Sequence, residues 1–148
     1  MGLRDTLGLL ASAATAVGVL LAWRQLALGK EQAVSAFEDT LSREYRDIAH
    51  SLPLEALLGE EMADSWLEDS LKDFYRYFDL TNEQIFLRAE GRITLATWNN
   101  WIDGIRANMD RPAFRSAWQA VASRSQGNFA ELRRLEEAGF KGDPRSWR

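Results

Sequence analysis

The chain has 148 residues, of which 46% are hydrophobic, and a formal net charge of −4. It contains no cysteine, which excludes disulfides and thiolate metal sites. His50 is the only histidine, which argues against a histidine-rich metal site or a histidine-based catalytic triad within one chain. Residues 1–30 carry a net +2, so residues 31–148 carry −6, and such an acidic domain argues against nucleic-acid binding.

The N-terminal segment from Thr6 to Trp23 contains no charged residue. A helix of this length spans roughly 27 Å, close to the about 30 Å of a bilayer's hydrocarbon core. We therefore expect residues 1–30 to form a single transmembrane helix with short flanks, with Trp23 and Arg24 at the interface. Two alternatives remain open: a secretory signal peptide, or a buried helix of a soluble protein.

The basic residues near this segment predict its orientation. Four basic residues follow it: Arg24, Lys30, Arg43 and Arg46. Only Arg4 and the terminal amine precede it. The positive-inside rule therefore places residues 31–148 in the cytoplasm and makes the lipid bilayer a partner.

Small residues recur on one face of the predicted membrane helix. Ala14, Gly18 and Ala22 lie four apart, a spacing that lets two membrane helices approach closely. The pattern favours self-association or packing on a membrane partner, although an alanine-rich segment also produces such spacings by chance.

Residues 31–140 predict a compact all-α domain, a bundle of four to five helices. The first expected element is an amphipathic helix over 31–51 that continues the membrane helix and ends before Pro53. A helical turn over 54–58 and a long central helix over 62–90 follow. The remaining elements are a helix capped by Thr94, a helix capped by Asp110, and a last helix over 129–138. Residues 141–148 are expected to form a flexible tail.

Polar residues interrupt the apolar pattern of the central helix. Asp79, Asn82 and Glu83 lie within one helical turn of each other, and Arg88 and Arg92 follow. One interpretation is structural: the acids pair with Arg88, Arg92 or Arg76, or cap a neighbouring helix, and so fix the helix register. The other is a site that binds a ligand or a partner. Catalysis is the weakest interpretation, because two carboxylates alone need widely separated pKa values to act as acid and base.

Trp98 and Trp101 are spaced to lie on one side of the following helix. Core packing explains this spacing, with the indole N–H groups bonded to Asp79 or Glu83. The alternative is an aromatic wall of a small-molecule pocket, where Arg88, Arg92 and Arg106 would supply positive charge.

Three sequence segments, FYRYFDLTNEQIFLRAEGRI, TWNNWIDGI and RPAFRSAW, resemble a group of small uncharacterised bacterial membrane proteins. The shared pattern reads YFDLxNEQxFLRxxGRI and TWxxWxxGI, and it extends over roughly residues 5–135 with one N-terminal membrane helix. The resemblance implies a single-pass protein of the bacterial inner membrane with a domain of unknown function. It implies no activity.

The function expected from the sequence is that of a membrane-anchored accessory or scaffold protein that acts through protein–protein contacts and self-association. The alternative is a membrane-anchored sensor or effector that binds a small ligand, such as a nucleotide second messenger in antiviral defence. The sequence contains no catalytic signature and predicts no enzyme, no cofactor and no metal site.

Overall fold

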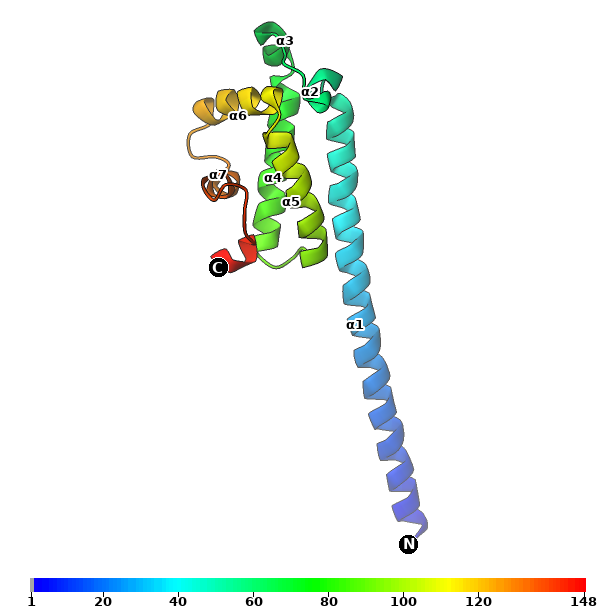
Figure 1. The fold of residues 1–148 in the computed structure, drawn as a ribbon. Helices are drawn as coiled ribbons and strands as arrows, with labels where there is room; N and C mark the ends of the chain where they lie inside the picture. The colour runs from blue at the N-terminus through cyan, green and yellow to red at the C-terminus, as the bar shows by residue number, and fades with distance from the viewer. Residues whose placement is uncertain (1) are drawn as a thin grey trace. The chain divides into compact units, whose positions relative to one another are not determined.

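The computed structural model describes residues 2–148, and the side chains of residues 3–14 and 16 lie outside that description. All elements of the described chain are helical, as the sequence predicts (Figure 1). Their bounds are α1 Leu3–Ser51, α2 Leu54–Leu58, α3 Asp64–Asp69, α4 Leu71–Ala89, α5 Leu95–Met109, α6 Pro112–Arg124, α7 Ala130–Glu137 and the 3₁₀ helix η1 Pro144–Trp147.

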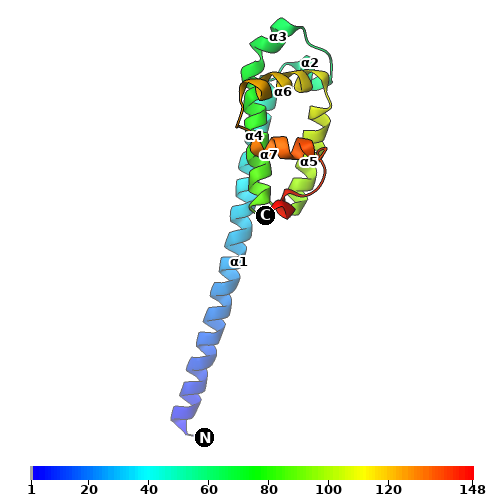
Figure 2. The same cartoon turned by 90° about the vertical axis from the view of Figure 1, so that its left-hand side faces the viewer.

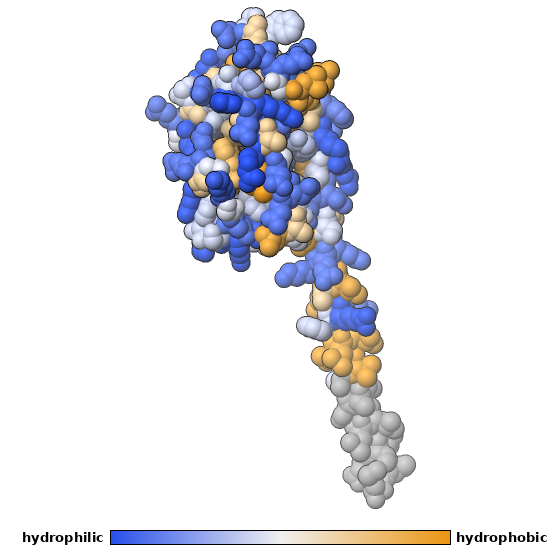
Figure 3. Space-filling model, in the orientation of Figure 1, coloured by the Kyte–Doolittle hydropathy of each residue, from blue (hydrophilic) through white to orange (hydrophobic). Residues whose placement is uncertain are grey.

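The chain divides into two compact units, residues 1–37 and residues 38–148. The first unit is helical from Leu3 onward, as expected for the N-terminal segment. Among its described side chains, Val19, Leu20 and Leu21 follow one another and each exposes more than half of its surface. Figure 3 shows hydrophobic residues gathering on this part of α1 next to the undescribed atoms.

The membrane-spanning character of the first unit stays a prediction. Within the described side chains, none of the helices combines the length and apolarity required to cross a bilayer. Most of the predicted span lies outside that description, including Ala14 of the small-residue pattern. Of the other two members, Ala22 is exposed, and a Cβ added to Gly18 would meet open space.

The second unit begins within α1, which continues to Ser51 and stops before Pro53 as predicted. The short helix α2 also forms as expected, and Gly59 ends it in the left-handed region with φ 83°. The predicted central helix is divided in two. The break falls at Ser70, between α3 and α4, and α3 buries none of its residues, so little packing holds it in line with α4.

Helix α4 is the centre of the second unit, and both α6 and α7 cross it (Figure 2). The core between them is aromatic, and ring contacts join α4 to α6 and to the start of α7. Phe74 meets Phe114 at 5.2 Å between ring centroids, and Phe78 meets Trp118 at 5.1 Å. Both pairs are edge-to-face, an arrangement that stabilises beyond the area buried.

Helix ends are set by local signals that the sequence predicts in most cases. Gly91 follows α4 with φ 71°, and its N–H and that of Arg92 bond back to the last turn, as in a Schellman motif. The Thr94 side chain caps α5 by accepting from the Thr97 N–H at 3.2 Å. The prediction that Asp110 caps α6 is wrong: Asp110 ends α5, and Arg111 precedes α6 without a side-chain cap.

The prediction of a loose C-terminal tail is also wrong. Residues 144–147 form η1, which packs against α4, and Pro144 is buried. Arg145 donates to the carbonyl of Ala89, and Arg148 pairs with Glu90. The tail thus covers the end of α4, where free carbonyl groups need partners.

Candidate functional site

Helix α4 has a second buried face that consists of polar side chains. Tyr77, Thr81, Gln84 and Arg88 recur at spacings of four, three and four residues, and each is at most 8% exposed. Burial of a polar side chain costs free energy unless its hydrogen bonds are satisfied within the protein. The partner of each residue therefore indicates what the residue does.

Three of the four residues are satisfied inside the fold. The Thr81 hydroxyl donates to the Tyr77 carbonyl at 2.8 Å, and the Tyr77 hydroxyl accepts from the amide nitrogen of Asn108 at 3.1 Å. Arg88 donates through Nε to Asp143 at 2.8 Å and through Nη1 to the Ile93 carbonyl at 2.7 Å. These contacts engage Thr81 and Arg88 within the fold, whereas Tyr77 also lines the cavity described below.

Burial keeps Tyr77 neutral. It raises the pKa of the Tyr77 hydroxyl to about 12, against the opposing effect of the hydrogen bond from Asn108, and the neighbouring Tyr45 adds to the increase. Tyr77 is therefore a neutral hydroxyl at physiological pH and remains neutral into alkali.

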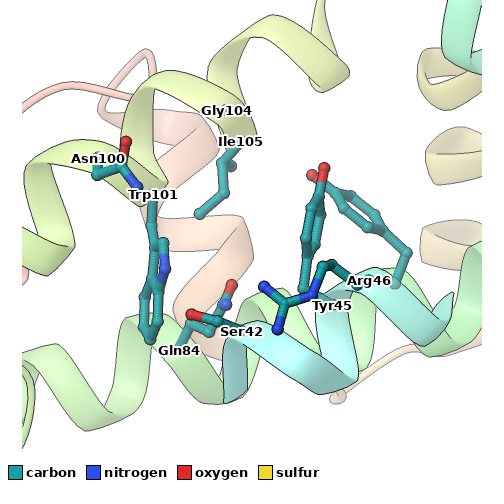
Figure 4. Close-up of a pocket in the computed structure, with 9 residues that line it drawn as sticks. Ser42, Tyr45, Arg46, Gln84, Asn100, Trp101, Gly104 and Ile105 are labelled. Carbon is teal, nitrogen blue, oxygen red and sulfur yellow. The ribbon is translucent and has the colours of Figure 1, made fainter. Parts of the chain in front are cut away.

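Gln84 is the exception. It is 4% exposed, yet its amide makes no hydrogen bond with any residue that the structure describes. Its side chain instead reaches a cavity of about 270 Å³ between α1, α4 and α5 (Figure 4). Among the described residues, Nε of Arg106 is the one side-chain polar atom that is fully buried without a partner, so the Gln84 amide is accessible within the cavity. Water or a ligand in that space can pair with its donor and its acceptor.

Two residues of the cavity wall are small. Gly104 on α5 has no side chain, and a Cβ added there would meet nothing within 4 Å. Ser42 on α1 is the other small residue of the lining.

The remaining lining combines aromatic rings, amides and one cation. Trp101 of α5 forms one side of the space, and Tyr45 and Arg46 of α1 lie opposite (Figure 4). The guanidinium of Arg46 points toward the amide of Gln84, and Asn100 lies beside Trp101. No acidic residue lines the cavity. This arrangement can bind a small polar molecule, but it contains no nucleophile paired with a base.

The structure separates the acids of the predicted cluster from the arginines that were expected to bind them. Asp79 and Glu83 are both exposed, so the expectation that they pair with Arg88 or Arg76 or accept from the tryptophans is wrong. Nη1 of Arg76 lies 3.9 Å from Oδ1 of Asp73, which is one helical turn before Arg76. Arg88 pairs with Asp143. The register of α4 places both acids on its solvent side.

Asn82 has an architectural role that the sequence indicates only in part. Its Oδ1 accepts from the backbone N–H groups of Glu131 and Leu132 at 3.1 and 3.0 Å. Asn82 thus caps the first turn of α7 from another helix, which explains a polar residue on the apolar stripe. Asp79 and Asn82 also line a polar hollow beside the start of α7.

The two tryptophans have different surroundings. Trp98 is 1% exposed and packs in the core, as the structural interpretation expects. Trp101 is half-buried and forms the wall of the cavity, as the pocket interpretation expects. The predicted cations of that pocket, Arg88, Arg92 and Arg106, do not line it. Arg106 instead donates to the Phe140 carbonyl at 2.9 Å.

Sequence reasoning missed Gln84, Tyr45 and Arg46 as site residues. One signal was present: Gln84 continues the spacing from Tyr77 to Arg88 and forms a second stripe on α4. No such signal marks Arg46, because an arginine on a surface helix is ordinarily a solvated residue. Among the described residues, no group of three acidic or histidine side chains is placed to hold a metal ion.

Comparison with known proteins adds no assignment, because no family model, no curated protein and no solved structure matches the chain. The resemblance to small bacterial membrane proteins therefore stays a prediction.

Proposed function

We propose that residues 38–148 form a small-molecule-binding domain whose site is the cavity between α1, α4 and α5. The observation that carries this proposal is Gln84, a residue only 4% exposed whose amide has no described protein partner and is accessible from the cavity. A site of this type, concave and aromatic with a few placed polar groups, is the usual form of a ligand pocket. The protein would act as a sensor or effector, the second of the two functions expected from the sequence.

The proposal includes membrane attachment through the N-terminal helix, with the domain in the cytoplasm. Thr6 to Trp23 is free of charge, and consecutive exposed apolar residues such as Val19, Leu20 and Leu21 point to different sides of α1. A helix that is apolar all round requires apolar surroundings, which a bilayer supplies. Carbonate extraction of membranes from expressing cells tests this part, and release of the protein into the soluble fraction would contradict it.

Native mass spectrometry of the purified full chain tests ligand binding. We expect the wild type to carry a small molecule from the cell or to bind one from a fragment library. Gly104→Leu should abolish that binding, because Gly104 lines the cavity and a bulky side chain there meets no protein atom that would keep it out of that space. Ala107→Leu is the matched control, since Ala107 is exposed on the same helix and does not line the cavity.

The outcome that would overturn the proposal is equally defined. Binding that survives Gly104→Leu would place the ligand elsewhere on the protein. A wild type that binds no small molecule would identify the cavity as a water-filled space. Circular dichroism melts of both variants would separate loss of binding from loss of fold.

A scaffold function remains the second proposal, because one end of the domain exposes apolar side chains. Leu54 and Leu58 lie four apart on α2 and are 63% and 65% exposed, and Trp66 on α3 is 58% exposed. Figure 3 shows hydrophobic atoms gathered over α2. Exposed apolar side chains at neighbouring positions favour a protein contact, here self-association or a membrane partner.

Light scattering of the full chain tests the scaffold proposal. We expect an oligomer that dissociates when Leu54 and Leu58 are both changed to serine. Leu95→Ser is the control, because Leu95 is 52% exposed at the start of α5. A wild type that is monomeric would contradict self-association.

A further inference from the structure

We propose that the ligand of this cavity is a planar nitrogen heterocycle that carries one acid group. This inference rests on the proposed function and specifies the chemical class that the site would select. It follows from four properties of the lining: its aromatic walls, the free amide of Gln84, the cation Arg46 and the limited volume.

The walls favour a flat, aromatic ligand. Trp101 lies on one side of the space and Tyr45 on the other, and Tyr77 contacts Tyr45 at 6.3 Å between ring centroids (Figure 4). Aromatic side chains stack on the faces of planar heterocycles irrespective of their substituents. A saturated sugar or an aliphatic acid would use little of this surface.

Gln84 favours a ring edge with a donor next to an acceptor. Its amide offers Oε1 as an acceptor and Nε2 as a donor, and neither is used within the described part of the fold. A carboxamide pairs in a bidentate manner with such an edge, as it does with N6 and N7 of adenine. A hydrocarbon ring would leave both groups of Gln84 unpaired, which costs binding free energy.

Arg46 favours an acid group on the ligand. Its guanidinium points into the space toward Gln84, and no described acidic side chain is paired with it. The lining itself contains no aspartate or glutamate that would repel an anion. Ser42 and Asn100 add neutral donors close to the same space. An arginine fork binds either a carboxylate or a phosphate through two hydrogen bonds.

The volume limits the ligand to one heterocycle, at most one sugar ring, and one acid group. About 270 Å³ is slightly below the roughly 300 to 1,000 Å³ of typical ligand sites. A dinucleotide is too large, so the acid group belongs to a mononucleotide or to a heterocyclic carboxylic acid.

Isothermal titration calorimetry of the full chain tests the inference with two pairs of probes. The affinities of adenosine 5′-monophosphate and adenosine are compared to test whether the acid group is a phosphate. The affinities of orotate and uracil are compared to test whether it is a carboxylate. We expect one acid of these pairs to bind about tenfold or more tightly than its neutral counterpart, because the charged contact to Arg46 is lost in the latter. The pair that shows this difference identifies the source.

Two substitutions assign the binding to named side chains. Arg46→Gln should weaken the acidic probe about tenfold and leave the neutral probe unchanged. Arg43→Gln is its control, because Arg43 is exposed on α1 and does not line the cavity. Gln84→Leu should weaken both members of the pair, and thermal melts will show whether it remains folded.

The results that overturn the inference differ from those that overturn the proposed function. Equal affinity for acidic and neutral probes, or equal effects of Arg43→Gln and Arg46→Gln, would reject the acid group. If neither probe binds while another molecule is displaced by Gly104→Leu, the ligand class is wrong and the site remains. If no molecule binds in the cavity, both proposals are wrong.

Discussion

The guanidinium of Arg88 binds the carboxylate of Asp143 through two hydrogen bonds, Nε to Oδ1 at 2.8 Å and Nη2 to Oδ2 at 2.5 Å. The two residues are 55 positions apart, and Arg88 is 8% exposed. The pair therefore attaches the last eight residues of the chain to the end of α4. The bidentate geometry is the strongest form of an arginine–carboxylate contact.

Removal of the carboxylate should cost more than an ordinary surface change, because it leaves a buried cation without its partner. We expect Asp143→Asn to lower the free energy of unfolding by about 2 kcal/mol. Urea unfolding of the full chain measures this difference. Asp103→Asn is the control, since its contact with Arg106 is more exposed and should contribute little. Equal effects of the two substitutions would contradict a special role for Asp143.

The same pair predicts a dependence on pH. Arg88 lowers the pKa of Asp143 through its hydrogen bonds, against the opposing effect of partial burial. A carboxylate whose folded pKa is lowered stabilises the fold above its unfolded pKa of about 3.9, and the contribution is lost as the pH falls through the folded pKa. The stability difference between wild type and Asp143→Asn should therefore be constant above about pH 5 and shrink below pH 4. A difference that does not change between pH 3 and pH 7 would contradict the pairing.

Arg88 and Asp143 also show where the sequence stops being informative. Most helix positions follow from apolar spacing and from local signals such as Pro53, Gly91 and Thr94, because those effects act within a few residues. The partner of Arg88 lies in a polar, proline-containing tail whose composition resembles a loose terminus. Nothing in the spacing of the two residues predicts their contact.

The residues that line the candidate site are likewise only partly predictable from the sequence. The sequence identifies Trp101 as a possible pocket wall, but it assigns the positive charge to three other arginines. The structure places Arg46 of α1 opposite Trp101 instead. A cavity forms where three helices leave space, so its members depend on tertiary packing and on the absence of a side chain at Gly104.

We expect removal of the Asn82 amide to destabilise the start of α7. Its Oδ1 accepts two backbone N–H groups that an isolated helix start would leave unpaired. Asn82→Ala should lower the free energy of unfolding by about 1 kcal/mol, as for the loss of a helix cap. It should also increase hydrogen exchange at the Glu131 and Leu132 amides. Glu83→Ala, at the exposed neighbouring position, should do neither, and increased exchange in both variants would contradict the cap.

We expect substitution of Gly91 to lower the free energy of unfolding through two separable effects. Its φ of 71° disfavours any residue with a Cβ, and an added Cβ would lie 2.4 Å from Nη1 of Arg145. Gly91→Ala should cost about 1 kcal/mol for the backbone conformation, plus the loss of the Arg145 contact with the Ala89 carbonyl. In the Arg145→Ala background only the backbone cost remains, so a double-mutant cycle should show coupling. Additive effects in that cycle would contradict the contact.

Tyr77 predicts a loss of stability in alkali. Its pKa is raised to about 12 in the fold, chiefly by burial, from an ordinary value of 10. A group with a raised pKa contributes stability below its unfolded pKa and loses it as the pH rises through the folded pKa. The wild type should therefore lose stability between about pH 10 and pH 12 to a greater extent than Tyr77→Phe. Chemical unfolding at pH 8 and pH 11 measures this, and parallel curves would contradict the assignment.

We predict that the glycine at position 104, which lines the cavity, lowers the free energy of unfolding of the protein. It lies inside α5, where glycine is less favourable than alanine by about 0.5 to 1 kcal/mol, and a Cβ there would meet open space. Gly104→Ala should therefore stabilise the protein by about that amount, whereas Ala107→Gly on the same helix should destabilise it similarly. If Gly104→Ala also weakens ligand binding, the glycine is retained for the cavity and not for the fold. A destabilised Gly104→Ala would show that the cavity is narrower than the structure indicates.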